Sequence, residues 1–174
     1  LRAAVAAVMP YHAAPDFDYV VIGRRTTVGR KFDALRWLQF AEQDGTTATM
    51  LVPVQYRRLM QEPRFDEFDL SSLQLKYCTS APFPAELKRE VLDRMPGALV
   101  EIYSMTEGGV VCLLEAHKFP DKLHTVGRPA PGSELKVLDD EDKPVAPGEA
   151  GNLIGRSQTM MTGYKKDVES FWNR

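Results

Sequence analysis

Three short apolar runs separated by amphipathic stretches constrain the fold of this chain most strongly. Each run has the length of one strand, and between consecutive runs the apolar residues return at helical spacing. The runs are TATMLVP at 47–53, LQLKYCTS at 73–80 and ALVEIYS at 98–104. The stretch PAELKREVLDRMPG at 84–97 places a proline and an acid where a helix begins. Strands that alternate with helices lie parallel and are joined by right-handed crossovers, which predicts an α/β fold.

The pattern changes after about residue 125. Before it, DYVVIG at 18–23 and FDALRWLQFAEQDG at 32–45 predict a further strand and helix. After it, the alternating runs ELKVLD and NLIGRS flank the acidic turn DDED, which is typical of an antiparallel hairpin. We therefore expect parallel strands alternating with helices over about 1–120 and a small antiparallel β element over about 125–160. A boundary near 118–127 would divide a subdomain at 1–124 from one at 125–174.

The composition narrows the classes of partner. The 22 Lys and Arg residues nearly balance 24 Asp and Glu, so the chain has no basic excess that would favour nucleic acid or an anionic membrane. No window approaches the ~18 apolar residues of a membrane span, so no transmembrane segment is expected. Cys78 and Cys112 lie in apolar runs without a second cysteine at metal spacing, which predicts buried free thiols and a cytoplasmic protein.

Two polar segments follow neighbouring strands of the predicted sheet. They are CTSAP at 78–82 and YSMTEGG at 103–109. Ligands of open parallel sheets bind at the carboxyl ends of the strands, so we expect both loops to lie over one crevice. An aromatic ring could stack on a base there, a threonine hydroxyl could bind phosphate, and a glutamate could hold magnesium. Spacing alone leaves open the alternative that Tyr103 and Met105 are core residues and Thr106 caps a turn.

The sequence resembles the adenylate-forming enzymes, which include acyl- and aryl-CoA synthetases, luciferases and peptide synthetase adenylation domains. Four segments carry the resemblance in the family's order and cover nearly the whole chain. They are PYHAAP at 10–15, DLSSLQLKYCTSAPFPAEL at 69–87, YSMTEGG at 103–109, and the stretch from Thr125 to the Gly-Tyr pair at 163–164.

The resemblance implies that a carboxylic acid is activated by ATP as an acyl-adenylate and passed to a thiol, commonly coenzyme A. It implies that magnesium is held by Glu107, which with Thr106 would form the catalytic pair. It also implies two sets of binding residues. The nucleotide would be bound by Ser80, Ala81, Pro82, Tyr103, Ser104, Met105 and Thr106, and the acid pocket would be lined by His12, Gly108, Gly109 and Val110. His117 and His124 are expected to be surface residues without partners.

The sequence also departs from the family pattern. Ser104 stands where glycine is usual and requires a negative φ, Asn152 replaces a usual Glu, and Arg-Ser-Gln at 156–158 replaces a more typical Arg-Gly-Pro. The phosphate loop of the family is expected upstream of Leu1, and the ribose-binding aspartate and C-terminal lysine domain downstream of Arg174. We therefore expect this chain by itself to be inactive.

Three functions remain open at this stage. The first is part of an ATP-dependent acid–CoA ligase acting in fatty or aromatic acid metabolism. The second is an adenylation domain that loads a carrier protein, and the third is a non-catalytic nucleotide-binding or interaction module. The identity of the acid is not predicted, and a homo-oligomer is possible.

Overall fold

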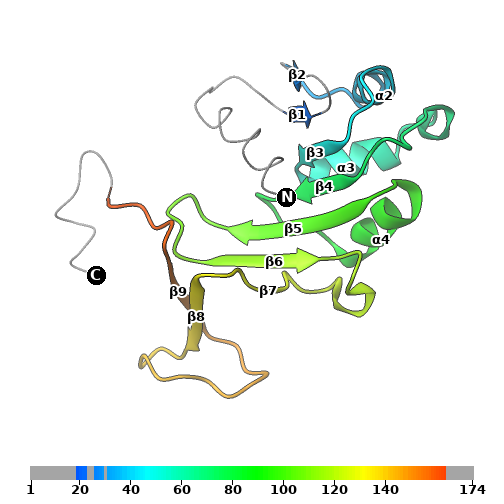
Figure 1. Cartoon of the computed structure of the whole chain (residues 1–174). Coiled ribbons are helices and arrows are strands. Elements are labelled where there is room, and N and C mark those ends of the chain that lie inside the picture. Colours follow the sequence, from blue (N-terminus) through cyan, green and yellow to red (C-terminus); the bar gives the residue numbers. More distant parts are fainter. Residues whose placement is uncertain (1–18, 23–25, 30, 164–174) are drawn as a thin grey trace. The chain divides into compact units, whose positions relative to one another are not determined.

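The computed structural model describes residues 19–22, 26–29 and 31–163 of this 174-residue chain (Figure 1). The chain divides into two compact units, each built from two segments. The first unit contains residues 1–102 and 114–126, and the second contains residues 103–113 and 127–174. The subdomain boundary that we expect near residue 124 stays a prediction.

The sheet of the first unit is parallel at its centre and antiparallel at one side. Its strands are β1 (Tyr19–Ile22), β2 (Thr26–Gly29), β3 (Ala48–Leu51), β4 (Leu75–Cys78) and β5 (Ala98–Ser104), in the order β2-β1-β3-β4-β5. β3, β4 and β5 are parallel neighbours, which confirms the predicted α/β class. β1 runs antiparallel to both β2 and β3, so the expectation of parallel strands is wrong there. A three-residue connection between β1 and β2 forces a hairpin, because parallel strands need a longer crossover.

The helices of the first unit lie between its strands, as the spacing predicted. They are α2 (Ala34–Gln43), α3 (Pro53–Met60) and α4 (Ala85–Arg94), with 3-10 turns η2 (Phe65–Glu67) and η3 (Pro120–Lys122). The Asp33 carboxylate caps α2 by accepting the Arg36 N–H at 2.8 Å. α3 begins at Pro53, whose missing N–H costs nothing in a first turn. α2 packs against α3 and α3 against α4, so the helices support one another beside the sheet.

The core of the first unit is a contiguous cluster of aliphatic and aromatic side chains from these helices and strands. Burying each large apolar side chain stabilises the fold by about 1.5–3 kcal/mol. The largest of its fully buried side chains are Trp37, Leu38, Leu51, Tyr56, Leu59, Val91, Met95, Leu99 and Leu123. Cys78 and Cys112 are both buried and free, which confirms the prediction made for the two thiols.

Lys76 in β4 is fully buried and holds the end of α4. Its ammonium donates to the carbonyls of Met95, Pro96 and Gly97 at 3.0, 2.5 and 2.7 Å. These carbonyls follow the last turn of α4, where a positive charge is favourable. Burial lowers the pKa of Lys76 to about 8. The lysine therefore joins a strand to the helix that leads into the next strand.

The second unit contains β7 (Arg128–Pro129), β8 (Ser133–Leu138) and β9 (Asn152–Ser157), together with the first residues of β6 (Val111–Glu115). β8 and β9 pair antiparallel from Ser133 opposite Ser157 to Leu138 opposite Asn152, which confirms the predicted hairpin. β7 pairs antiparallel with β6. Neither β6 nor β7 was predicted.

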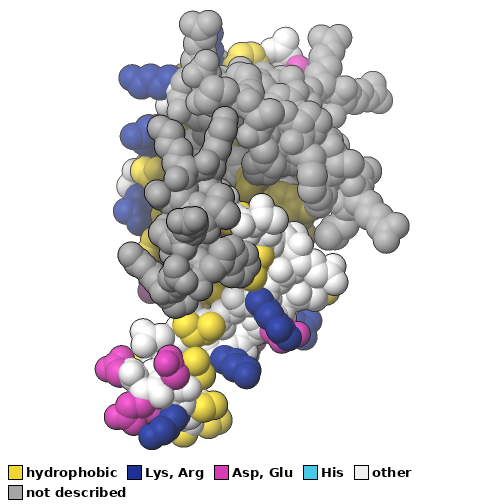
Figure 2. All heavy atoms as spheres, turned by 90° about the vertical axis from the view of Figure 1, so that its left-hand side faces the viewer, with side chains coloured by type: hydrophobic (Ala, Val, Ile, Leu, Met, Phe, Trp, Pro, Cys, Tyr) yellow, Lys and Arg dark blue, Asp and Glu magenta, His cyan; other side chains and the backbone are white. Residues whose placement is uncertain are grey.

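The β8–β9 hairpin exposes side chains on both of its faces. Val137, Leu153 and Ile154 are 37%, 38% and 51% exposed. At the turn, the Asp139 carboxylate accepts the N–H groups of Glu141 and Lys143, each at 2.9 Å, as expected of a solvated turn. Figure 2 shows the charged and hydrophobic side chains of this region together at the bottom of the view. The hairpin is therefore held mainly by its ladder.

Candidate functional site

The first candidate loop, Cys78–Pro82, leaves the carboxyl end of β4. Ser80, Ala81 and Pro82 are exposed, and Ser80 has a φ of 77°, in the left-handed region that side chains rarely adopt. Such a conformation costs of order 1–3 kcal/mol and persists only where the surroundings impose it. The sequence did not predict this backbone conformation.

Two stacked rings hold the residues on either side of this loop. Phe83, buried just after Pro82, stacks on Tyr56 of α3 with ring centroids 5.6 Å apart and planes inclined by 14°. The Tyr56 hydroxyl donates to the carbonyl of Tyr77 in β4 at 2.8 Å. The loop thus begins and ends on residues fixed to the core, while Ser80–Pro82 face outward.

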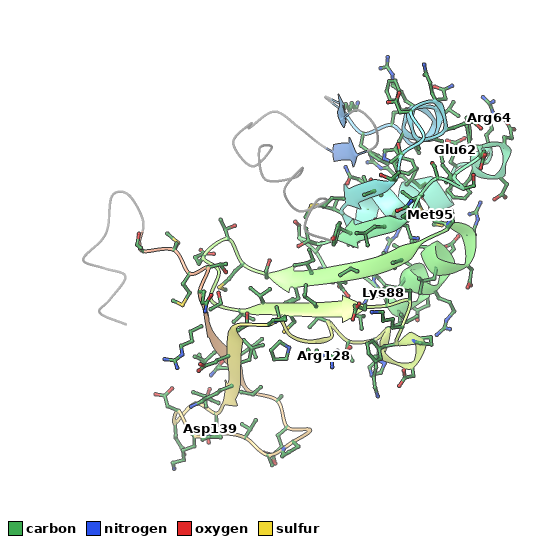
Figure 3. The ribbon with its side chains drawn as sticks, viewed as in Figure 1. Glu62, Arg64, Lys88, Met95, Arg128 and Asp139 are labelled. Carbon is green, nitrogen blue, oxygen red and sulfur yellow. The ribbon has the colours of Figure 1, made fainter. Side chains whose placement is uncertain are left out.

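A buried ion pair lies close to this loop. Lys88 of α4, which is labelled in Figure 3, contacts the Glu101 carboxylate of β5 at 2.5 Å and lies 5.8 Å from the centroid of Phe83. Its ammonium also donates to the carbonyls of Leu123 and Thr125, each at 2.8 Å. Burial raises the pKa of Glu101, although Lys88 opposes that shift. The sequence analysis did not single out either residue.

Cys78, at the end of β4, has the environment of a structural thiol. Burial, together with the charge of Glu101, raises the pKa of Cys78 far above its usual value. Because the thiolate is the nucleophilic form, this thiol is inert near neutral pH.

The second candidate loop, Tyr103–Gly109, belongs to the second unit. Tyr103 is 44% exposed and Met105 is 51% exposed, so the alternative that both are core residues is wrong. Thr106 is exposed and Glu107 is half-buried. Ser104 is not among the residues with positive φ in the described chain, so the condition expected for replacing glycine there is met.

Backbone hydrogen bonds fix the end of this loop. The Gly108 N–H donates to the carbonyl of Met105 at 3.0 Å and closes a turn. The Glu107 carbonyl accepts the N–H of Met161 at 2.9 Å, and the Gly108 carbonyl accepts the Ser157 hydroxyl. The sequence analysis missed Ser157 and Met161, whose contacts with the loop no local pattern reveals.

Gly108 and Gly109 are buried where the loop passes close to another part of the chain. Gly108 has a φ of 78°, and a Cβ there would collide with the carbonyl of Thr159. A Cβ on Gly109 would come within 3.1 Å of the Gly155 carbonyl oxygen. The fold therefore requires glycine at 108 and leaves little room for a side chain at 109, and the expectation that Gly108, Gly109 and buried Val110 line an acid pocket stays a prediction.

The two loops follow strands that end at the same edge. β4 and β5 are parallel, and their register places Cys78 opposite Glu101. The loops belong to different compact units, and the expectation that they lie over one crevice stays a prediction. His12 and the tyrosine of the Gly-Tyr motif lie outside the described residues.

His117 differs from expectation because it has a partner. Its Nδ1 lies 3.1 Å from the carbonyl oxygen of Leu99, so the prediction that it has no partner is wrong. His124 is exposed, as predicted.

The Thr106–Glu107 pair is the part of the loop that fits a magnesium ion. Among residues 19–22, 26–29 and 31–163, no three His, Cys, Asp or Glu side chains gather as a metal cluster. Mg²⁺ often keeps its waters and binds through one or two carboxylates plus the phosphates of a substrate. One half-buried carboxylate beside an exposed hydroxyl suits that mode of binding.

None of the helices in these same ranges has the length and apolar character needed to cross a membrane.

Comparison with known proteins gives one family. The model of the family described as AMP-binding enzyme matches residues 19–165. The indoleacetate–CoA ligase of Aromatoleum aromaticum is 34% identical over 85% of this chain and 29% of its own length. The feruloyl-CoA synthase of an Amycolatopsis species is 36% identical over 76% of this chain and 27% of its own length.

A solved structure agrees with these relatives. The amide bond synthetase McbA from Marinactinospora thermotolerans superimposes with a TM-score of 0.74 at 28% identity, over 82% of this chain and 29% of that protein. The chain thus spans less than a third of the length of these three proteins.

Proposed function

Because this chain belongs to the AMP-binding enzyme family, we propose that it supplies nucleotide-binding loops to an ATP-dependent carboxylic acid–CoA ligase. In the proposed first step, a carboxylate oxygen of the acid attacks the α-phosphorus of ATP and pyrophosphate leaves. In the second step, the thiol of coenzyme A attacks the acyl carbon and AMP leaves. The two buried free thiols suit a reducing compartment such as the cytoplasm.

The nucleotide would be held by both candidate loops. Tyr103 stacks on the adenine ring, with Ser104 and Met105 beside it in the same loop. Such a stack contributes about 1–3 kcal/mol per base in other proteins. Ser80, Ala81 and Pro82 of the first loop are the other proposed nucleotide-binding residues, and all three are exposed.

The reacting phosphates would be met by Thr106 and Glu107. The Thr106 hydroxyl donates to a phosphate oxygen, and the Glu107 carboxylate is the protein ligand of magnesium. Magnesium bound there would neutralise charge that develops on the phosphates. Because phosphoryl chemistry depends mainly on positioning and charge stabilisation, a fixed loop backbone favours catalysis.

The acid would bind near the end of the second loop. Gly108, Gly109 and Val110 line that pocket in this proposal, and His12 stands at its entrance. The names of two relatives indicate that they act on indoleacetate and ferulate, so aromatic acids are the first to test.

One observation carries the proposal most directly. Tyr103 and Met105 are exposed at the end of a strand although both are large and apolar. Exposed aromatic and thioether side chains on a loop whose backbone is hydrogen-bonded are typical of a binding surface.

The test is ATP–pyrophosphate exchange by the whole protein that contains this segment, with a panel of aromatic and aliphatic acids. We expect Glu107→Gln to lower exchange about 100-fold or more, because a charge-stabilising group is lost. Glu141→Gln removes a carboxylate of the same unit whose ion-pair partner is the exposed Lys143, and it should leave exchange unchanged. Exchange equal to wild type in Glu107→Gln would refute the role given to Glu107.

The same preparation separates the alternatives. Transfer of the acyl group to coenzyme A supports the ligase, whereas transfer only to a carrier protein indicates a loading domain. Absence of exchange with retained MgATP binding in titration calorimetry would indicate a non-catalytic nucleotide-binding module.

A further inference from the structure

We propose that Ser157 is a positioning residue that fixes the backbone carrying Glu107, and this inference rests on the function proposed above. Ser157 is the last residue of β9, and it lies 49 residues after Gly108 in the sequence. Its hydroxyl donates to the carbonyl oxygen of Gly108, the residue that follows Glu107. A side chain from the hairpin thus holds the loop that carries the proposed metal ligand.

Two consecutive carbonyls of the loop are bound by one short segment. Met161 N–H holds the Glu107 carbonyl at 2.9 Å, while the Ser157 hydroxyl holds the Gly108 carbonyl. The peptide group between Glu107 and Gly108 is also held at its N–H, because the Gly108 N–H donates to the carbonyl of Met105 at 3.0 Å. The two peptide planes that follow the Glu107 Cα are therefore both oriented, and the direction of its Cα–Cβ bond is restricted with them.

The Ser157 hydroxyl is itself oriented by Thr159. The Thr159 hydroxyl lies 2.8 Å from Ser157 Oγ, and the Thr159 N–H donates to the same oxygen at 3.2 Å. With both of these groups donating to it, Ser157 Oγ directs its own proton to Gly108. The hydroxyl therefore acts as a fixed link between two backbones.

A conformationally free residue makes this link useful. Gly108 has a φ of 78° and no side chain to restrict rotation, so its carbonyl would turn easily without a donor. A carboxylate that must meet phosphate charge gains from a backbone that is already oriented before the ligand arrives. Ser157 supplies that donor.

The experiment compares Ser157→Ala, Ser157→Thr and the neighbouring control Gln158→Ala in the whole protein. Gln158 is exposed and adjacent, and it has no role in the proposed site. Pyrophosphate exchange is measured against Mg²⁺ concentration, and melting temperature is recorded for each variant. We expect Ser157→Ala to raise the half-maximal Mg²⁺ concentration about threefold to tenfold, the effect of one lost hydrogen bond. Ser157→Thr keeps the hydroxyl and should restore the wild-type value, as should Gln158→Ala.

A double-mutant cycle tests whether Ser157 acts through Glu107. The Kd for MgATP is measured by titration calorimetry for Ser157→Ala alone and in a Glu107→Gln background. We expect Ser157→Ala to weaken binding in the wild type and to have no further effect once the carboxylate is gone. Equal penalties in both backgrounds would mean a purely structural role and would overturn the inference.

The outcomes distinguish this inference from the function on which it rests. Wild-type exchange with an unchanged Ser157→Ala overturns the positioning role alone, whereas a wild type without exchange or MgATP binding overturns both. If Ser157→Ala does not fold, Thr159→Val decides, because it removes one group that orients the Ser157 hydroxyl. A rise in the half-maximal Mg²⁺ concentration that is smaller than the rise expected of Ser157→Ala supports the inference, and an unchanged Mg²⁺ dependence contradicts it.

Discussion

The two candidate loops follow neighbouring parallel strands, but different interactions hold them in place. The loop at 78–82 lies between residues fixed to the core of the first unit, where Phe83 stacks on Tyr56. The loop at 103–109 is fixed by hydrogen bonds to the segment 157–161 of the second unit, whose hairpin exposes Leu153 and Ile154. Packing is non-directional and tolerates small shifts, whereas hydrogen bonds fix orientation.

This difference separates stability from geometry. A substitution in the first unit should change the free energy of unfolding and leave the shape of the second loop alone. A substitution around 157–161 should change the loop with a small effect on unfolding. The following predictions are arranged to test that separation.

The largest effect should come from the core of the first unit. Trp37 is fully buried, and Trp37→Ala should lower the free energy of unfolding by about 3–5 kcal/mol through lost burial and an unfilled cavity. Ile154→Ala, at a hairpin position that is 51% exposed, should change it by only about 0.5 kcal/mol or less. Urea denaturation measures both, and equal losses would break the comparison.

A smaller effect, confined to the second loop, is expected from Gly108→Ala. The new Cβ meets the Thr159 carbonyl and must also adopt a φ of 78°, so the loop should shift at a cost of about 1–3 kcal/mol. Gly132→Ala is the matched control, since Gly132 has a φ of 81° but nothing within 4 Å of its Cβ position. MgATP binding should weaken in the first variant and stay unchanged in the second. Equal binding would show that the close approach to Thr159 does not shape the loop.

The smallest effect is a pH dependence that Lys76 of the first unit contributes. The pKa of Lys76 is about 8 in the folded protein, whereas an ordinary lysine titrates at 10.5, so at this site the unfolded chain binds more protons between these pH values. The contribution of Lys76 to stability should therefore rise with pH in this window, by about 1.5 kcal/mol between pH 8 and about pH 9.5. Lys76→Met cannot titrate and should lack this rise, which denaturation at each pH would detect. A parallel rise in the variant would place its origin elsewhere.

Local periodicity predicted the regular elements of the first unit well. The strand at 98–104 and the helix that starts after Pro84 were predicted because each has a clear repeat and clear end signals. The strands β2, β6 and β7 were missed. The antiparallel pairing of β1 with β2 follows from a short connection that the sequence analysis did not use.

The sequence suggested a chemistry for the second loop, which stays a prediction, but it did not reveal the contacts that fix the backbone of the loop. The sequence indicated which types of residue could meet a nucleotide because hydroxyl, carboxylate and aromatic groups stand together after a strand. The contacts that Ser157 and Met161 make with the loop were missed because these residues reach it from about 50 residues away, and a hydrogen bond to a carbonyl leaves no composition signal. The buried charges of Lys76 and Lys88 escaped for the same reason, since both donate to backbone carbonyls.

The Lys88 ammonium also limits where this chain can be cut and recombined with a relative. It joins α4 to Glu101 in β5 and to the carbonyls of Leu123 and Thr125. These two residues belong to the second segment of the first unit, residues 114–126. A chimera with a crossover point between Glu101 and Leu123 would pair this lysine with a foreign segment, and a misplaced carbonyl would leave a buried charge short of acceptors. A crossover after Val126 keeps all of these partners from one parent, so recombination there should preserve the first unit intact.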